Sequence, residues 1–375
     1  MASSRTVQTT LQRYREEIQA ALREAVAHAT ASTGAEAFWL LQDYYGQMRY
    51  HLGWVDAQLR PISVQTGKLL RPTLLLLSYE AAGAWGQLPS EDESRRYLQR
   101  ALPAAAAIEL THNFTLIHDD IVDEDSERHH RPTVWKLWGV PHALNAGDGM
   151  FALSRLALWG VLEVGVDPAL AARLAALLDR TCLTIAEGQY LDMLFETRMD
   201  VSVEVYIEMI RRKTAALMAC AAEMGALLGT QERETVERLR HFGEALGLAF
   251  QVRDDLLGVW ASLDELGKNP AGDLYRRKKS LPILHALAHA QPADRERLQT
   301  LYQQSAPLSR EQVDEILAIF ARTETRSYCQ AFLAEQCRRA RATLEAVPAS
   351  STPLARRARN DLEAFVDFIE AASQS

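Results

Sequence analysis

The chain has 375 residues and a formal net charge of −8, with 48% hydrophobic and 24% charged residues, an ordinary balance for a soluble globular protein. Its sequence contains no long basic block, which argues against nucleic-acid binding. No apolar run approaches the roughly 18 residues that a membrane span needs, and the first residues lack the apolar core of a signal peptide. A cytoplasmic protein without a transmembrane segment is therefore expected.

Hydrophobic periodicity and the scarcity of glycine and proline predict an all-α protein. The first expected element is an amphipathic N-terminal helix within residues 1–30, and the second covers residues 35–58. Pro72 then fits the first turn of an apolar helix. Further helices are expected over residues 95–123, 143–164, 168–195, 202–228, 231–260, 279–290, 309–320, 324–345 and 354–372. Because the linkers are short, the pattern favours one domain of ten or more helices over residues 1–375.

Within that domain the segment His112–Thr133, HNFTLIHDDIVDEDSERHHRPT, carries the densest group of acidic residues. Helical geometry places Asp119 and Asp123 one above the other, with Asp120 beside them. Three carboxylates on one helical face repel each other unless a cation lies among them. Mg²⁺ suits such oxygens, because it bridges carboxylates to substrate phosphates. A solvated acidic face is the alternative, but the apolar residues before the aspartates favour a cavity.

A second acidic pair occurs in GLAFQVRDDLLGVW at residues 247–260, where Asp254 and Asp255 follow Gln251. A third carboxylate four residues after Asp254 would copy the first cluster, but Gly258 stands there. Residues that could bind phosphate are distributed along the chain: Gly67, Lys68, Arg71, Lys213, Thr214, Lys268 and Lys278. An exposed acidic pair and surface lysines are the alternative reading of this group. The GK pairs do not form a GxxxxGK phosphate-binding loop, because Ile62 and Ser262 replace its first glycine.

Taken together, these motifs resemble the trans-isoprenyl diphosphate synthases of the polyprenyl synthetase family. The matching segments follow the family's order: TGKLLRP, LIHDDIVDED, RPTVW, NAGD, GQYLDM, RRKTAAL, FQVRDD and DLYRRKKSLP. The resemblance implies the isoprenoid synthase fold, a helical bundle around a central apolar cavity with acidic motifs at its mouth. It places the catalytic core in residues 60–290 and C-terminal helices in residues 305–375. It also implies Mg²⁺-dependent, head-to-tail joining of an allylic diphosphate to isopentenyl diphosphate by a homodimer.

The same resemblance assigns roles to individual residues. The expected Mg²⁺ ligands are Asp119, Asp120, Asp123, Asp254 and Asp255, and Lys213 is expected to be catalytic. The expected contacts to the allylic diphosphate are Arg128, Lys213 and Lys268. The expected isopentenyl diphosphate site contains Gly67, Lys68, Arg71 and His112. Thr214, Gln251 and Lys278 are expected to contact substrate as well.

Two positions depart from the family pattern. The second arginine after the first acidic cluster, which resembles an isopentenyl diphosphate contact, is replaced by His129, and His130 or Arg131 could compensate. The other departure is Gly258. These two departures leave open the alternative of a class I terpene cyclase or lyase, which ionises one prenyl diphosphate. Such an enzyme needs no isopentenyl diphosphate site and so has little use for Lys68, Arg71 and His112. A non-catalytic partner subunit is a third alternative, which the complete first cluster disfavours.

Residues before the first aspartate set product length in this family. A large side chain four or five positions before Asp119 acts as the floor of the cavity, and here these positions are Thr115 and Phe114. One aromatic residue there resembles the geranylgeranyl diphosphate synthases, so a twenty-carbon product is expected. Five residues of helix rise about 7.5 Å, which is the right order of depth. Ideal helical stepping turns Phe114 away from the aspartate face, and ordinary core packing is its alternative role.

Overall fold

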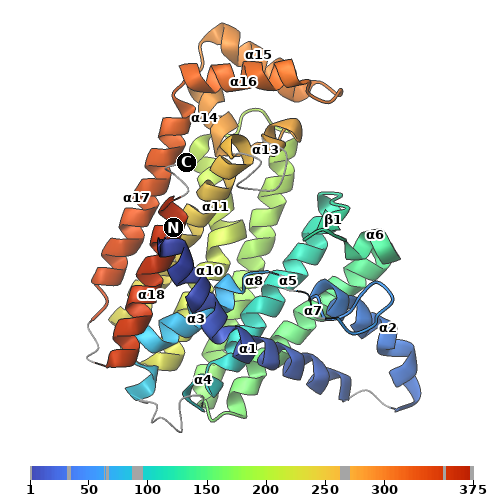
Figure 1. The fold of residues 1–375 in the computed structure, drawn as a ribbon, viewed down its shortest axis with the longest axis vertical. Coiled ribbons are helices and arrows are strands. Elements are labelled where there is room, and N and C mark those ends of the chain that lie inside the picture. The colour runs from blue at the N-terminus through green and yellow to red at the C-terminus, as the bar shows by residue number, and fades with distance from the viewer. Residues whose placement is uncertain are drawn as a thin grey trace.

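The computed structural model describes residues 2–31, 35–62, 64, 67–86, 96–261, 271–348 and 352–371, and helices dominate them (Figure 1). The all-α prediction is confirmed. The first half of the chain contains α1 (Ala2–Ala31), α2 (Ala35–His51), α3 (Leu70–Ala81), η1 (Ala84–Gly86), α4 (Arg96–Gln99), α5 (Leu102–Val122), β1 (Glu127–Arg128), β2 (Arg131–Pro132), α6 (Val134–Trp138), α7 (Val140–Trp159) and η2 (Gly160–Leu162).

The second half of the chain continues in the same way. It contains α8 (Pro168–Glu196), α9 (Val203–Ile210), the π-helical turn η3 (Arg211–Ala215), α10 (Ala216–Gly229), α11 (Arg233–Trp260), α13 (Gly272–Tyr275), α14 (Leu281–His289), α15 (Pro292–Gln303), α16 (Arg310–Arg322), α17 (Thr325–Glu345) and α18 (Pro353–Glu370). None of the described helices combines the length and apolarity needed to cross a membrane.

The centre of the bundle is formed by α3, α5, α10 and α11, and most residues of α3 and α10 are buried. Leu74, Leu75, Leu76 and Leu77 of α3 are fully buried, and α3 packs against α10. Because a helix that is buried all round needs no polar face, this composition fits a central position. α15 and α16 cross one end of the molecule, and α17 runs along one side (Figure 1).

Buried charge ties the two ends of the chain to this centre. Glu80 of α3 is fully buried and accepts hydrogen bonds from Tyr14 Oη at 2.9 Å and Tyr97 Oη at 2.5 Å. Arg357 of α18 donates to the same carboxylate at 3.0 Å. Because a buried carboxylate needs such partners, Glu80 joins α1, α4 and α18 to α3.

Several boundaries differ from the sequence-based expectation. The helix expected over residues 95–123 is interrupted between α4 and α5, because Pro103 fits the first turn of a new helix better than a helix interior. The helix expected over residues 202–228 contains the π-helical turn, and the loop expected after the first cluster forms the hairpin β1–β2. α15 was not expected at all. Two of these differences, the hairpin and the π-helical turn, concern segments that carry predicted site residues.

Candidate active site

One cavity of about 840 Å³ opens between α3, α5, α8, α11, the hairpin and the π-helical turn. Predicted site residues from each of these elements except α8 line it: Gly67, Lys68, Arg71, His112, Phe114, Thr115, Asp119, Asp120, Arg128, His129, Lys213, Thr214, Gln251 and Asp254. Asp123, Asp255 and Lys278 lie outside this lining, and Lys268 falls outside the described residues. The structure thus brings most of the sequence-predicted site to one place.

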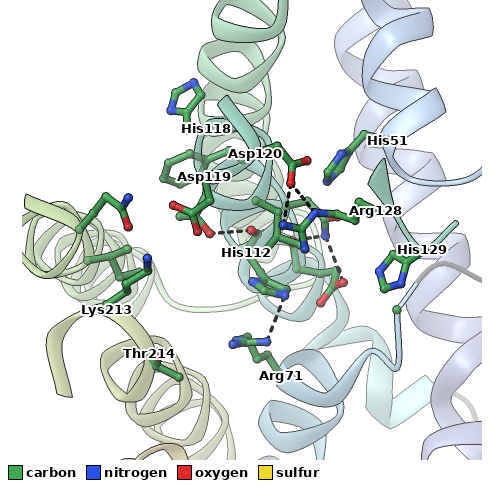
Figure 2. A pocket seen from close by; sticks show the side chains of 18 of the residues that line it. His51, Arg71, His112, His118, Asp119, Asp120, Arg128, His129, Lys213 and Thr214 are labelled. Atoms are coloured by element: carbon green, nitrogen blue, oxygen red, sulfur yellow. Dashed lines mark hydrogen bonds and ion pairs between the residues drawn. The ribbon is translucent and has the colours of Figure 1, made fainter. Parts of the chain in front are cut away.

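The first acidic cluster occupies the last turn of α5. Asp120 is 1% exposed, and Arg128 of the hairpin donates from Nε to its Oδ1 at 2.8 Å. Asp119 lies on the side of Lys213 (Figure 2). Burial raises the pKa of Asp119 to about 6 and also raises the pKa of Asp123, although Lys213 opposes both shifts. A raised pKa means that the ionised carboxylate is not fully stabilised by its surroundings. The cations of the protein alone therefore do not balance the charge of this cluster.

A divalent cation fits this cluster. The Oδ2 atom of Asp120 is buried and has no hydrogen-bond partner in the structure, a costly arrangement unless a ligand satisfies it. Among the described residues, no three His, Cys, Asp or Glu side chains are close enough to hold a metal by themselves. Further ligands would therefore come from phosphate or water, which Mg²⁺ commonly keeps.

Lys213 is placed by the π-helical turn η3, which faces α8. Its Nζ is 2.6 Å from Asp192 Oδ2. Burial alone would lower the pKa of Lys213, but Asp119 and Asp192 outweigh this effect and raise it. Gly188 of α8 permits the close packing of η3 on α8, because a Cβ atom at this position would lie only 2.8 Å from Lys213 Cα. Asp192 has no role in the sequence-based prediction, since only the fold pairs it with Lys213.

The second acidic pair lies on α11 and divides into two environments. The side chain of Asp254 is 46% exposed toward the cavity, and desolvation there raises its pKa to about 6. Asp255 is 1% exposed and accepts hydrogen bonds from Tyr206 Oη at 2.6 Å and Gln251 Nε2 at 3.0 Å. Gln251 Oε1 in turn accepts from Thr214 Oγ1 at 2.8 Å. Asp254 is therefore available to a ligand, whereas the oxygens of Asp255 are already bonded within the protein.

A group of cations and histidines forms another wall of the cavity. Arg71 Nη1 lies 3.1 Å from His112 Nε2, and both side chains face the cavity (Figure 2). Burial and the charge of Arg71 hold the pKa of His112 well below its usual value, so a neutral imidazole accepts from the guanidinium. Lys68 Nζ is 5.6 Å from the ring centroid of Phe368 on α18, and Arg253 is 4.9 Å from the same ring. Arg253 also lines the cavity and was not predicted.

The turn of the hairpin contains His129 and His130, both with positive φ. His129 lines the cavity and His130 does not. Arg131 donates to the carbonyl oxygens of Tyr50 at 3.0 Å and Val55 at 2.7 Å. Both Nη atoms of its guanidinium are thereby bonded to the backbone, but Arg131 also lines the cavity, so compensation for the missing arginine stays a prediction.

The predicted floor residues are neighbours on α5 and point in different directions from it. The ring of Phe114 contacts Phe151 of α7 edge-on, with 5.2 Å between centroids. Thr115 Oγ1 donates to the His112 carbonyl at 2.7 Å. Both residues line the cavity, so a side chain of different size at either position changes its volume.

Comparisons with known proteins agree with this geometry. A polyprenyl synthetase family model matches residues 53–320. The (2E,6E)-farnesyl diphosphate synthase of Mycobacterium tuberculosis is 43% identical over 249 residues, which span 66% of this chain and 64% of that protein. The geranylgeranyl diphosphate synthase of the same organism is 39% identical over 270 residues, 72% of each chain.

Comparison with solved structures also identifies polyprenyl synthetases as similar proteins. The crystal structure of a polyprenyl synthetase from Streptomyces coelicolor A3(2) superposes with a TM-score of 0.81 and 35% identity, covering 97% of this chain and 99% of that one. The sequence match and the structural match thus extend over most of the residues that form the cavity. This chain belongs to the polyprenyl synthetase family.

Proposed function

We propose that this protein is an Mg²⁺-dependent trans-prenyltransferase that joins an allylic diphosphate to isopentenyl diphosphate and releases a longer trans-prenyl diphosphate. The observation that carries this proposal is that acidic residues from α5 and α11 share one cavity with the cations Lys68, Arg71 and Arg253. The condensation uses two diphosphate substrates and therefore needs two binding places. We assign one to the acidic residues and the other to the cationic residues. We propose that the described helices act as one catalytic domain.

The acidic walls suit the allylic substrate. When bound, Mg²⁺ would join Asp119, Asp120, Asp123 and Asp254 to the diphosphate and stabilise the negative charge that develops as the allylic C–O bond breaks. Lys213 and Arg128 supply fixed positive charge beside the same carboxylates. The apolar part of the cavity, which includes Phe114 and Ile185, would keep water from the allylic carbocation.

The cationic wall suits isopentenyl diphosphate. Lys68, Arg71 and Arg253 bring three cations to it, and His112 orients the guanidinium of Arg71. Arginine binds phosphate oxygens through two parallel hydrogen bonds, so Arg71 is well suited to this task. Attack by the isopentenyl double bond on the allylic cation, followed by loss of a proton, would complete the condensation.

We propose geranylgeranyl diphosphate as the main product, because Phe114 is the one aromatic residue at the floor position and Thr115 leaves space beside it. Relatives with both farnesyl and geranylgeranyl names match this chain, so membership of the family does not decide the product length, and the proposal depends on the floor residues. A homodimer is our proposal for its assembly.

The metal assignment is tested by replacing Asp119. Asp119→Ala removes charge stabilisation at the breaking bond, so turnover should fall by at least about 10³-fold while the helical content stays unchanged. The measurement is the steady-state rate with Mg²⁺, isopentenyl diphosphate and an allylic starter, with and without chelator. Asp314→Ala on the exposed face of α16 is the control. Near-wild-type turnover in Asp119→Ala would refute the site.

A further inference from the structure

The aromatic ring of Phe368 on α18 is shared by two cations of the cavity. Lys68 Nζ lies over this ring at 5.6 Å from its centroid, and Arg253 Cζ lies over it at 4.9 Å. Both distances fall within the range of about 6 Å over which an aromatic face attracts a cation. Lys68 and Arg253 line the cavity, whereas Phe368 does not. One ring outside the cavity therefore brings together cations from the segment before α3 and from α11.

We propose that Phe368 is a positioning residue that holds Lys68 and Arg253 in place for the diphosphate group of isopentenyl diphosphate. This inference rests on the proposed function, because it assigns a residue to the same cationic wall. Phe368 acts through the two cations and does not itself contact the substrate. The catalytic core expected over residues 60–290 then depends on the last helix of the chain.

An aromatic ring suits this task better than a carboxylate does. Lys68 and Arg253 repel each other, because both carry a positive charge, and an attractive group beside them opposes this repulsion. A carboxylate in that place would also neutralise the cations and compete with phosphate for them. The face of an aromatic ring attracts cations through its quadrupole and leaves their net charge unchanged. Both cations therefore stay available to an anion.

The contacts of Arg253 support this role. Its Nε atom is buried and has no hydrogen-bond partner within the described part of the chain. Its Nη1 atom lies 3.7 Å from Asp254 Oδ1, which is beyond hydrogen-bonding distance. The side chain is only 14% exposed, and buried donors without partners are costly unless a ligand accepts from them. The oxygens of a diphosphate in the cavity would be such acceptors.

The position of Phe368 is fixed by the packing of α18. Phe365 and Ile369, on either side of it in the sequence, are each 1% exposed. Asp361, two turns earlier, accepts a hydrogen bond from Thr10 Oγ1 of α1 at 2.9 Å. α18 also packs against α3 and α11, which lie beside it (Figure 1). The backbone that carries Phe368 is therefore held close to the segments that supply both cations.

Fluorination of the ring tests the contact with the cations while leaving the packing nearly unchanged. Fluorine atoms withdraw electron density from the face of the ring, so they weaken its attraction for cations. We expect trifluorophenylalanine at position 368 to weaken the binding of isopentenyl diphosphate about threefold. Phe368→Leu should weaken it about fivefold, which corresponds to about 1 kcal/mol. Isothermal titration calorimetry with a chelator present measures this affinity, since contacts between phosphate and cationic side chains need no Mg²⁺.

Kinetics and thermal unfolding separate positioning from packing. The KM for isopentenyl diphosphate should rise by the same factors, whereas the KM for the allylic substrate should change by less than about twofold. The fluorinated protein should keep its melting temperature. Phe332→Leu, which truncates a partly buried ring on α17, is the control for lost packing and should bind like wild type. A loss of affinity in Phe368→Leu without a loss on fluorination would overturn the proposal, because it would leave Phe368 a packing role only.

Arg71→Gln separates this inference from the proposed function. It should weaken the binding of isopentenyl diphosphate at least about tenfold if the cationic wall binds this substrate at all. A loss in Arg71→Gln with unchanged affinity in both Phe368 variants would refute only the role of Phe368. Unchanged affinity in Arg71→Gln, or no binding to the wild-type protein, would refute the cationic wall as the isopentenyl diphosphate site and this inference with it.

Discussion

At the residue scale, His129 is the position where the proposed isopentenyl diphosphate site departs from the family pattern. An arginine is expected there from the family pattern, and the structure shows that the neighbouring Arg131 is already bonded to two backbone carbonyl oxygens. Imidazole offers no permanent charge and no paired donors. His51 lines the same region, and burial together with the charge of Arg128 lowers its pKa to about 3, so it stays neutral.

Restoring the arginine should strengthen this contact. His129→Arg is expected to lower the KM for isopentenyl diphosphate by about tenfold, which corresponds to about 1.4 kcal/mol for a charge-assisted hydrogen bond. The KM for the allylic substrate should change little. The backbone at this position has φ of 53°, a conformation that histidine adopts more often than arginine, so a small loss of stability is expected as well.

His130→Arg is the matched control for that experiment. It adds the same charge one residue away, in the same turn, but His130 does not line the cavity. Initial rates at varied isopentenyl diphosphate give both KM values. An equal decrease in both variants would show a general effect of surface charge instead of a specific contact.

At the element scale, α5 carries both the proposed metal site and the proposed floor of the cavity. The ring of Phe114 stacks edge-on against Phe151 of α7, which is partly exposed. Removing the ring in Phe114→Ala opens a path between α5 and α7, so products longer by at least one five-carbon unit are expected. Thr115→Phe fills the cavity from its other side and should shorten the product.

Chromatography of the dephosphorylated products, with mass spectrometry, measures these changes. Phe332→Ala, which removes a partly buried ring on α17, is the control for a general loss of packing. If both floor variants keep the wild-type product distribution, the cavity ends elsewhere and the proposed twenty-carbon product loses its support.

Helical periodicity predicted α1, α8 and α11 closely because each keeps one apolar stripe over many turns. It could not predict the π-helical turn, since that insertion depends on the close approach of Lys213 to Gly188. The two-residue strands of the hairpin are too short to show alternation. The acidic clusters were visible as local motifs, whereas the pairing of Asp192 with Lys213 and the packing of Asp273 on Gly258 arise only from the fold.

At the scale of the whole molecule, α7 and α8 carry several large apolar side chains that are exposed. Leu156 of α7 is 59% exposed and Leu183 of α8 is 63% exposed, whereas the exposed Tyr190 lines the cavity. Exposed apolar groups of this kind mark interaction surfaces more often than isolated surface residues do. A second copy of this chain is the occupant expected from the family, so this face supports the proposed homodimer.

Charge on that face should separate the subunits. Leu156→Glu combined with Leu183→Glu is expected to shift the protein from dimer to monomer, because burying two carboxylates per subunit costs several kcal/mol. Sedimentation velocity over a range of concentrations measures the change. Val205→Glu, an exposed apolar residue on α9, is the control. A double variant that sediments as wild type would place the interface elsewhere.

The proposed reaction joins the carbon chains of two prenyl diphosphates and releases one inorganic diphosphate. An experiment with isotope-labelled isopentenyl diphosphate tests it. The protein is incubated with Mg²⁺ and farnesyl diphosphate, with and without the labelled substrate, and the products are separated and identified. We predict a linear twenty-carbon diphosphate that carries the label and forms only when isopentenyl diphosphate is present. A cyclic hydrocarbon or alcohol released from the allylic diphosphate alone would contradict the account and favour a terpene cyclase.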